Sequence, residues 1–275
     1  MSFPSEKISE FTTFAMRLAD LARAETLPRF RNGASVTDKT GAASNLEFDP
    51  VTDADREGER VIRDLIAKTY PDHGVIGEEF GEMKGDGPWR WVLDPVDGTR
   101  AFVCGAATWT TLIALEHNGA PVLGLIDQPF TKERWLASNG ETVFQRGGEA
   151  RTCRTSGVSD LNRARISTTD PRPESYFGES PACAFARLAA ASRVARFSMD
   201  AYAYALLALG ELDVVAENSL QLHDYAALAP VVEGAGGVIT NWNGDPLGSD
   251  DRGEALAAAT PALHAAALEA LAVQS

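Results

Sequence analysis

The most restrictive feature of the sequence is an apolar run, Trp91-Val92-Leu93, that ends abruptly in Asp94-Pro95. Such a run is typical of a buried strand, and the proline removes the amide that the next hydrogen bond of a strand ladder would need. The backbone must therefore turn here, with a carboxylate at the end of a buried strand. Because Asp97 and Gly98 follow directly, Asp94 and Asp97 can converge from the two sides of the turn.

Turn signals divide the first half of the chain into short apolar runs. Asn118-Gly119 and Asn139-Gly140 each separate two such runs, and an Asn-Gly pair in this setting is typical of an antiparallel hairpin. Apolar residues at helical spacing predict a helix over residues 5–24, and Asp53 begins the pattern of a second helix. Residues 1–150 are therefore predicted to form an α+β lobe around an antiparallel sheet.

The second half of the chain has a different pattern, in which predicted strands alternate with predicted helices. Strands are expected at 164–168, 212–217 and 237–240, and helices at 174–191, 200–209, 224–233 and in the alanine-rich C-terminal region. This alternation is typical of α/β architecture. Residues 151–275 are therefore predicted to form an α/β lobe fused to the first, so that the whole chain is an α/β (α+β) protein.

Residues 32–50 form a long polar stretch without helical or strand periodicity. A loop of this length inside a compact protein is often a lid or a binding loop. Lys39 lies within it and is a candidate for substrate binding.

The composition excludes some partners. The 275 residues carry a formal net charge of −14 at pH 7, and no run of Lys or Arg interrupts this acidity, so nucleic acid is not expected as a partner. The first residues lack the basic and apolar regions of a signal peptide, and no apolar stretch reaches the roughly 20 residues of a membrane span. We therefore expect no membrane partner and a cytoplasmic location.

Carboxylates concentrate at four points where predicted elements begin or end. They lie in the segments Asp53-Ala54-Asp55, Gly77-Glu78-Glu79, Asp94-Pro95-Val96-Asp97 and His223-Asp224. Taken singly, each segment is also compatible with an ordinary turn or a helix cap. Carboxylate oxygens and the Val96 carbonyl are, however, the hard ligands that Mg²⁺ prefers. Gly98 would let a phosphate approach the amides of Gly98 and Thr99 at the start of a helix.

In this order along the chain, the acidic segments resemble the inositol-monophosphatase superfamily. The resemblance rests on three blocks: Gly77-Glu78-Glu79; Asp94-Pro95-Val96-Asp97-Gly98-Thr99; and Asp224-Tyr225-Ala226-Ala227 with Glu233-Gly234-Ala235-Gly236-Gly237. The second block is the most specific, and the three span most of the chain. The resemblance implies a layered αβαβα sandwich of the sugar-phosphatase type and commonly a homodimer. It also implies a magnesium-dependent phosphomonoesterase that acts on a small phosphorylated metabolite.

The same resemblance implies roles for individual residues. Two to three Mg²⁺ ions would be held by Glu78, Asp94, the Val96 carbonyl, Asp97 and Asp224. Asp55 and Thr99 would position or deprotonate the attacking water, and these two residues with Glu78 make up the expected catalytic set. His223 departs from the family, which often has Trp at this position, but the metal ligand Asp224 is intact.

Two further segments, Arg100-Ala101-Phe102 and Asp200-Ala201-Tyr202-Ala203-Tyr204, are similar to the histidinol-phosphate phosphatase branch. The expected reaction is therefore hydrolysis of L-histidinol phosphate to L-histidinol and phosphate, in histidine biosynthesis. Acids would face the substrate's ammonium and imidazole, and Asp200 and Glu217 are the candidates; alternatively they only cap a helix and end a strand. The expected substrate-binding set is Gly98, Thr99, Arg100, Asp200, Glu217 and Lys39.

Two other functions stay open. A phosphatase for inositol 1-phosphate or another small sugar or polyol phosphate would use the same metal site, with the acids accepting hydrogen bonds from hydroxyl groups. A non-enzymatic, metal-binding regulatory protein is the second alternative. Phosphate release stimulated by Mg²⁺ would separate an enzyme from such a protein.

Overall fold

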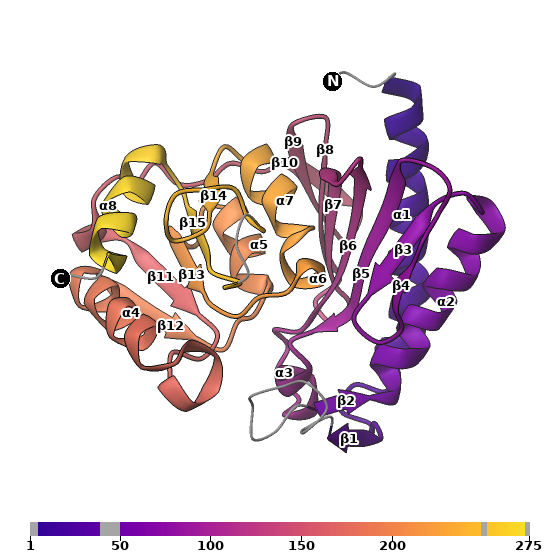
Figure 1. The fold of residues 1–275 in the computed structure, drawn as a ribbon, viewed down its shortest axis with the longest axis horizontal. Coiled ribbons are helices and arrows are strands. Elements are labelled where there is room, and N and C mark those ends of the chain that lie inside the picture. Colours follow the sequence, from indigo (N-terminus) through magenta and orange to yellow (C-terminus); the bar gives the residue numbers. More distant parts are fainter. Residues whose placement is uncertain (1–4, 39–49, 249–251, 273–275) are drawn as a thin grey trace.

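Helices and sheets stack in five layers in the computed structural model, which describes residues 5–38, 50–248 and 252–272 (Figure 1). Two N-terminal helices cover one face of an eight-stranded sheet, and short helices lie between that sheet and a five-stranded one. Two further helices cover the far face of the smaller sheet. This arrangement confirms the predicted αβαβα sandwich.

The helices group by layer. The outer layer over the large sheet contains α1 (Ser5–Thr26) and α2 (Asp53–Thr69). The middle layer contains α5 (Tyr202–Ala208), α6 (Leu222–Tyr225) and α7 (Leu228–Gly234), and the layer over the small sheet contains α4 (Glu179–Ala191) and α8 (Pro261–Leu271). Helix α3 (Thr99–Val103) and the turns η1 (Leu161–Arg163) and η2 (Pro173–Phe177) complete the set. No helix within the described ranges is long and apolar enough to cross a membrane.

The large sheet has the strand order β10-β9-β8-β7-β6-β5-β3-β4, and all neighbours are antiparallel except β3 and β5, which are parallel. Its strands are β3 (Gly74–Gly77), β4 (Gly81–Met83), β5 (Trp89–Asp97), β6 (Thr110–His117), β7 (Ala120–Gln128), β8 (Glu133–Ser138), β9 (Glu141–Arg146) and β10 (Glu149–Thr152). The hairpin turns predicted at Asn118-Gly119 and Asn139-Gly140 are confirmed, because all four residues have the positive φ that such tight turns need.

The small sheet has the strand order β12-β11-β13-β15-β14 and is mixed. Strand β11 runs parallel to both β12 and β13, whereas β15 runs antiparallel to β13 and β14. Its strands are β11 (Arg165–Thr168), β12 (Val194–Phe197), β13 (Val214–Glu217), β14 (Val238–Thr240) and β15 (Ala255–Ala258).

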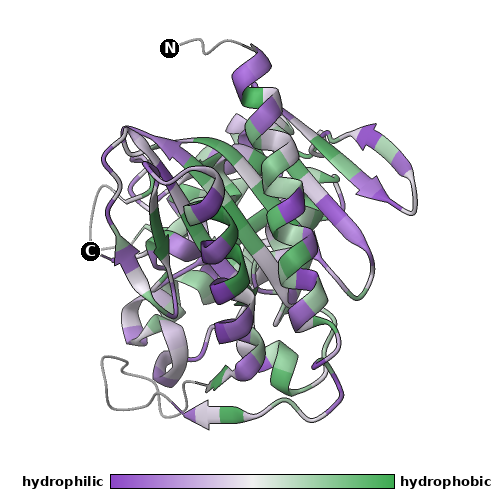
Figure 2. Cartoon of the chain, turned by 90° about the vertical axis from the view of Figure 1, so that its right-hand side faces the viewer, coloured by the Kyte–Doolittle hydropathy of each residue, from purple (hydrophilic) through white to green (hydrophobic). Residues whose placement is uncertain are grey.

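The outer helices are held on the large sheet by apolar packing and by ion pairs. Leu18 of α1 and Ile62 of α2 are fully buried in one cluster with Trp91 of β5. Figure 2 shows the hydrophobic strands lying behind these two helices, whose residues alternate between hydrophobic and hydrophilic. In addition, Arg23 of α1 lies 2.6 Å from the buried carboxylate of Asp127 on β7.

The middle layer approaches the large sheet closely at Gly124 on β7. A β-carbon at this position would overlap the carbonyl oxygen of Ala227 and lie 2.8 Å from Cγ of Pro230. Leu228 and Val231 of α7 are fully buried in the core between the two sheets. The missing side chain thus lets α6 and α7 settle against the large sheet, where α6 contacts β5.

Several predicted boundaries were wrong. The helix predicted at 174–191 begins only at Glu179, and residues 224–233 belong to two short helices instead of one. The alanine-rich C-terminal region contains strand β15 before α8. The ends of the predicted loop at 32–50 pair as a small antiparallel sheet of β1 (Val36–Asp38) and β2 (Pro50–Thr52). Lys39 and the centre of the predicted lid lie outside the described residues.

The Gly124→Ala substitution is expected to lower the free energy of unfolding by about 1–3 kcal/mol, because the added methyl group would overpack the contact with Ala227. Urea denaturation measures this change. The control is Gly157→Ala, since a β-carbon at Gly157 has no neighbour within 4 Å. Equal stability of the two variants would contradict the expectation.

Candidate active site

The turn predicted directly after Leu93 was wrong, because strand β5 continues through Pro95 to Asp97. The proline is instead accommodated by an irregularity, and the register with β6 shifts between Asp94 and Asp97. The amide of Val96 donates a 3.0 Å hydrogen bond to Asp94 Oδ1, and the Thr111 hydroxyl donates to the Pro95 carbonyl at 2.7 Å. Asp94 is therefore buried and held in one orientation at the end of the strand.

Helix α3 starts just after the end of β5. Gly98 precedes it with a φ of +78°, and a β-carbon there would lie 2.8 Å from Oδ2 of Asp200. Both the backbone conformation and the close contact therefore require glycine. The hydroxyl of the next residue, Thr99, lies 3.1 Å from both Oδ1 of Asp55 and the Val96 carbonyl oxygen. Asp55 and Thr99 are thus in direct contact, although 44 residues separate them along the chain.

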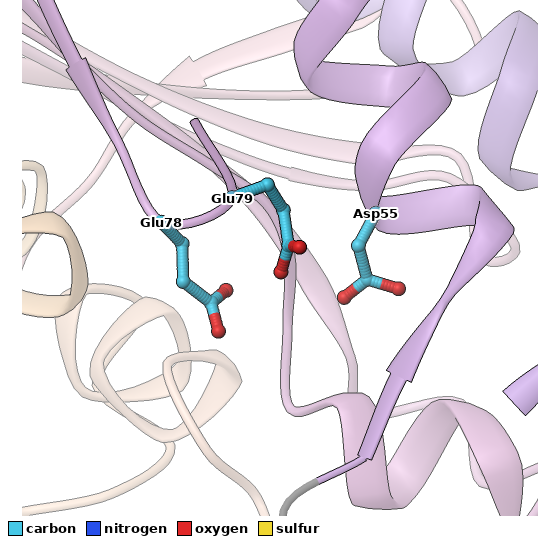
Figure 3. A group of neighbouring side chains, drawn as sticks. All are labelled: Asp55, Glu78 and Glu79. Atoms are coloured by element: carbon cyan, nitrogen blue, oxygen red, sulfur yellow. The ribbon is translucent and has the colours of Figure 1, made fainter. Parts of the chain in front are cut away.

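Asp55, Glu78 and Glu79 form one of two groups of acids. One carboxylate oxygen from each lies within 4.8 Å of the others, and Figure 3 shows Asp55 coming from a helix and the two glutamates from the turn after β3. The carboxylate of Glu59 holds that turn by accepting the Glu79 amide at 2.8 Å. A side chain at Gly77 would overlap the Glu59 carboxylate, so the glycine of the Gly-Glu-Glu block is required by packing.

Asp94, Asp97 and Asp224 form the second group, again with one oxygen from each within 4.8 Å. Asp97 accepts the amide of Ala201, just before α5, at 2.8 Å, and Asp224 of α6 accepts the amide of Gln221 at 2.6 Å. The group therefore joins the end of β5 to two helices of the middle layer.

The pKa values of the clustered acids indicate that this arrangement lacks a compensating positive charge. Burial is the first cause that raises the pKa of both Asp94 and Asp97, and the neighbouring carboxylates raise the pKa further. For Asp94 these neighbours include Glu78 and Asp55, so the two groups lie close enough to repel each other. Buried carboxylates that repel one another are stabilised by a bound cation, and oxygen donors of this kind suit a hard divalent ion. Both groups could hold a metal.

Glu217 is buried and Asp200 is half-buried beside the second group. Glu217, at the end of β13, accepts hydrogen bonds from the hydroxyls of Thr168 at 3.1 Å and Thr169 at 2.9 Å. Burial, with a smaller effect of Asp200, raises the pKa of Glu217 to about 8. Burial likewise raises the pKa of Asp200 to about 6, although Arg100 opposes the increase. These two acids are therefore incompletely compensated by positive charge.

Arg100 links the two halves of the molecule. Its guanidinium lies 4.8 Å from the ring centroid of Tyr176 and donates to the Ser175 hydroxyl at 3.2 Å. Arg100 thus lies between the turn that carries Gly98 and the turn η2.

The structure adds one acid to those that the sequence analysis selected. Glu78 clusters with Asp55 and with Glu79, a residue that the sequence analysis did not select. The sequence signal that could have indicated Glu79 is its position directly after Glu78. Glu59 was also missed, because only the fold shows that it binds the turn of the two glutamates.

Sequence and structural relatives establish the family. Residues 7–274 match the sequence profile of the inositol monophosphatase family. The chain belongs to this family. Chloroplastic bifunctional phosphatase IMPL2 of Arabidopsis thaliana is 38% identical over 249 residues, which are 88% of this chain and 68% of that protein. Histidinol-phosphatase of Mycobacterium tuberculosis is 35% identical over 239 residues, 84% and 86% of the two chains.

Among solved structures, an inositol monophosphatase from Zymomonas mobilis superposes with a TM-score of 0.82 at 36% identity, covering 96% of this chain and 98% of that one. The site described above therefore belongs to a member of the inositol monophosphatase family that is a phosphoric monoester hydrolase.

Replacing Glu217 by Gln is expected to flatten the pH dependence of stability in metal-free protein. The pKa of Glu217 is raised from 4.5 to about 8, so between these pH values the folded protein holds a proton that the unfolded chain releases. Stability therefore falls as the pH rises through this window, by up to about 1.4 kcal/mol per pH unit.

Thermal unfolding in EDTA between about pH 5 and pH 8 tests this. Relative to wild type, the Tm of Glu217→Gln should increase with pH, whereas the exposed control Glu211→Gln should show no such trend. A constant difference in Tm between wild type and Glu217→Gln would contradict the expectation.

Proposed function

We propose that the protein is a magnesium-dependent phosphatase that hydrolyses L-histidinol phosphate to L-histidinol and phosphate. The observation that carries the proposal is a pair of acids, the buried Glu217 and the half-buried Asp200, beside the acids that could hold metal. A relative named histidinol-phosphatase, 35% identical to the chain, supports it. The reaction would belong to histidine biosynthesis in the cytoplasm.

In this proposal each half of the chain supplies a different part of the active site. Residues 1–150 supply Glu78, Asp94, the Val96 carbonyl and Asp97 as magnesium ligands, and residues 151–275 supply Asp224 and the substrate contacts. The donors fit two to three Mg²⁺ ions, because they are oxygen atoms whose charges repel one another when buried. Bound Mg²⁺ would neutralise charge on the phosphate ester and make the attacking water more acidic.

Thr99 and Asp55 would orient the attacking water and receive its proton. The Thr99 hydroxyl is within hydrogen-bond distance of Asp55, so a proton can pass from water through the hydroxyl to the carboxylate. Burial raises the pKa of Asp55 to about 6, which makes it a stronger base than an exposed aspartate. Asp55 also accepts the amide of Thr52 at 2.9 Å, which keeps the carboxylate in place.

The start of α3 would bind the phosphoryl oxygens. The amides of Gly98 and Thr99 stand at the N-terminal end of this helix, where backbone N–H groups favour an anion. Arg100 lies next in the chain and would add positive charge on the same side. Lys39, which lies outside the described residues, remains a proposed substrate-binding residue.

The alcohol part of the substrate would face Asp200 and Glu217. L-histidinol phosphate carries an ammonium and an imidazole, and either cation would compensate two acids whose pKa values are raised by burial. The alcohol part of inositol 1-phosphate is a neutral polyol, which offers hydroxyl donors but no positive charge. That difference favours the amino alcohol over inositol phosphate, which stays the second candidate because the Zymomonas mobilis relative is an inositol monophosphatase.

Two further features of the proposal follow from the family. Family membership and the complete set of acids argue against a purely regulatory, non-catalytic protein. The resemblance to the superfamily also leads us to propose a homodimer, which light scattering after size-exclusion chromatography would test.

Asp94→Asn is expected to reduce kcat by at least about 100-fold, because it removes a charged ligand shared by the acid cluster. The Tm without metal should not fall, since the variant also removes a repelled, buried charge. Phosphate release in the presence of Mg²⁺ measures kcat. The exposed Asp64→Asn on α2 is the control, and turnover near wild type in Asp94→Asn would refute the metal assignment.

Protein stripped with EDTA and reloaded with Mg²⁺ is expected to have a kcat/KM for L-histidinol phosphate roughly 100-fold above that for inositol 1-phosphate. The reason is that Asp200 and Glu217 can bind the positively charged groups of L-histidinol phosphate, which inositol 1-phosphate lacks. A preference for inositol phosphate would keep the metal site and reject the substrate assignment. Absence of phosphate release from either ester, with and without Mg²⁺, would reject both.

A further inference from the structure

The turn at residues 78–80, which carries two acids of the first group, lies at the edge of the large sheet. It joins β3 to β4, and β4 is the outermost strand on that side. All three residues of β4 are exposed, and the side chain of Phe80 is 53% exposed. Hydrophobic packing therefore does little to fix the turn, although Glu78 and Glu79 depend on it for their positions.

Helix α2 holds this turn through polar contacts. Asp55, Glu59 and Arg63 follow one another at intervals of four residues, so they lie on the same face of the helix. Asp55 joins the acid group itself (Figure 3). One turn of helix further on, Glu59 Oε2 accepts the amide of Glu79 at 2.8 Å, and Oε1 accepts the amide of Phe80 at 3.3 Å.

Arg63 completes the contact between α2 and the hairpin. Its Nε donates to Glu59 Oε1 at 2.6 Å, and its Nη2 donates to the carbonyl oxygen of Gly81. The Glu59 side chain is fully buried, whereas that of Arg63 is 14% exposed. A buried carboxylate needs a compensating charge and hydrogen bonds, so Glu59 and Arg63 act as one unit. Both Glu59 oxygens already have partners within the protein, which makes Glu59 a support for the turn instead of a metal ligand.

The position of the turn matters because Mg²⁺ tolerates little error in its ligands. It demands near-octahedral geometry with oxygen atoms at about 2.0–2.1 Å, and a site is well formed only within roughly 0.2 Å of such distances. Asp55 belongs to α2, whereas Glu78 and Glu79 belong to the hairpin. Glu59 and Arg63 therefore fix the distance between the two parts of one acid group.

We propose that Glu59 and Arg63 are positioning residues that set the affinity of the group Asp55, Glu78 and Glu79 for Mg²⁺ by fixing the turn at residues 78–80. This inference rests on the proposed function, in which Mg²⁺ binds these acids, and deepens it. Neither residue touches the ion or the substrate, and both act through the backbone of the turn.

Two variants and two matched controls on the same helix test the inference. Glu59→Gln keeps the shape of the side chain but replaces one acceptor oxygen by an amino group, which cannot accept a backbone amide. Arg63→Lys keeps the charge but loses the planar fork that binds Glu59 and Gly81 together. The controls are Glu57→Gln and Arg60→Lys, because these residues form an exposed ion pair of 2.8 Å on α2.

Calorimetric titration with MgCl₂ of protein stripped with EDTA, well below its Tm, measures the affinity of the folded chain without any substrate. The Kd for Mg²⁺ should rise by about 10- to 100-fold in Glu59→Gln and in Arg63→Lys, as is typical when a residue that supports a metal ligand is replaced. The Mg²⁺ concentration that gives half-maximal phosphate release should rise by the same factor. At saturating Mg²⁺, kcat should return to that of wild type, and both controls should match wild type throughout.

An unchanged Kd for Mg²⁺ in folded Arg63→Lys would overturn the inference, and this variant decides alone if Glu59→Gln does not fold. A loss of kcat that excess Mg²⁺ does not restore would also overturn it, because that pattern indicates general damage to the fold. Wild-type protein that binds Mg²⁺ but hydrolyses neither L-histidinol phosphate nor inositol 1-phosphate would refute the proposed function alone, since the titrations still measure the metal site. Wild-type protein that binds no Mg²⁺ would refute both.

Discussion

The carboxylates of Asp94, Asp97 and Asp224 repel one another, and the fold holds one oxygen of each within 4.8 Å despite that repulsion. Each carboxylate accepts a backbone amide, which offsets part of the cost of burial. The donors are, in the same order, Val96 at 3.0 Å, Ala201 at 2.8 Å and Gln221 at 2.6 Å. The rest of the architecture can be understood as the means of bringing these three backbone segments together.

The middle helical layer performs most of this task. Strand β5 belongs to the large sheet, whereas α5 and α6 follow strands of the small sheet in the chain. Packing both sheets on one set of helices brings the end of β5 to the first turns of α5 and α6. Gly124 and Gly98 contribute by what they lack, since a side chain at either would separate elements that have to touch.

Local chemistry made part of this structure predictable. The Asn-Gly pairs predicted two hairpins. Pro95 after a buried run indicated an interruption of the strand ladder, but the strand resumes with a shifted register and ends only at Asp97. The strand at Ala255–Ala258 was mistaken for helix because alanine prefers helices when isolated; pairing with β13 and β14 overrides that preference. The grouping of Glu78 with Glu79 and Asp55 could not be predicted, because it depends on how α2 packs against the turn after β3.

The hydrogen bond from the Ala201 amide to Asp97 spans 104 residues of the chain. A ribosome therefore finishes the large sheet, including Asp94 and Asp97, well before it synthesises the helices that complete the site. Until then the aspartates of β5 lack the third acid of their group and the middle layer that buries them. Tight metal capture would accordingly be acquired late, and it would report that the two halves of a newly made molecule have docked.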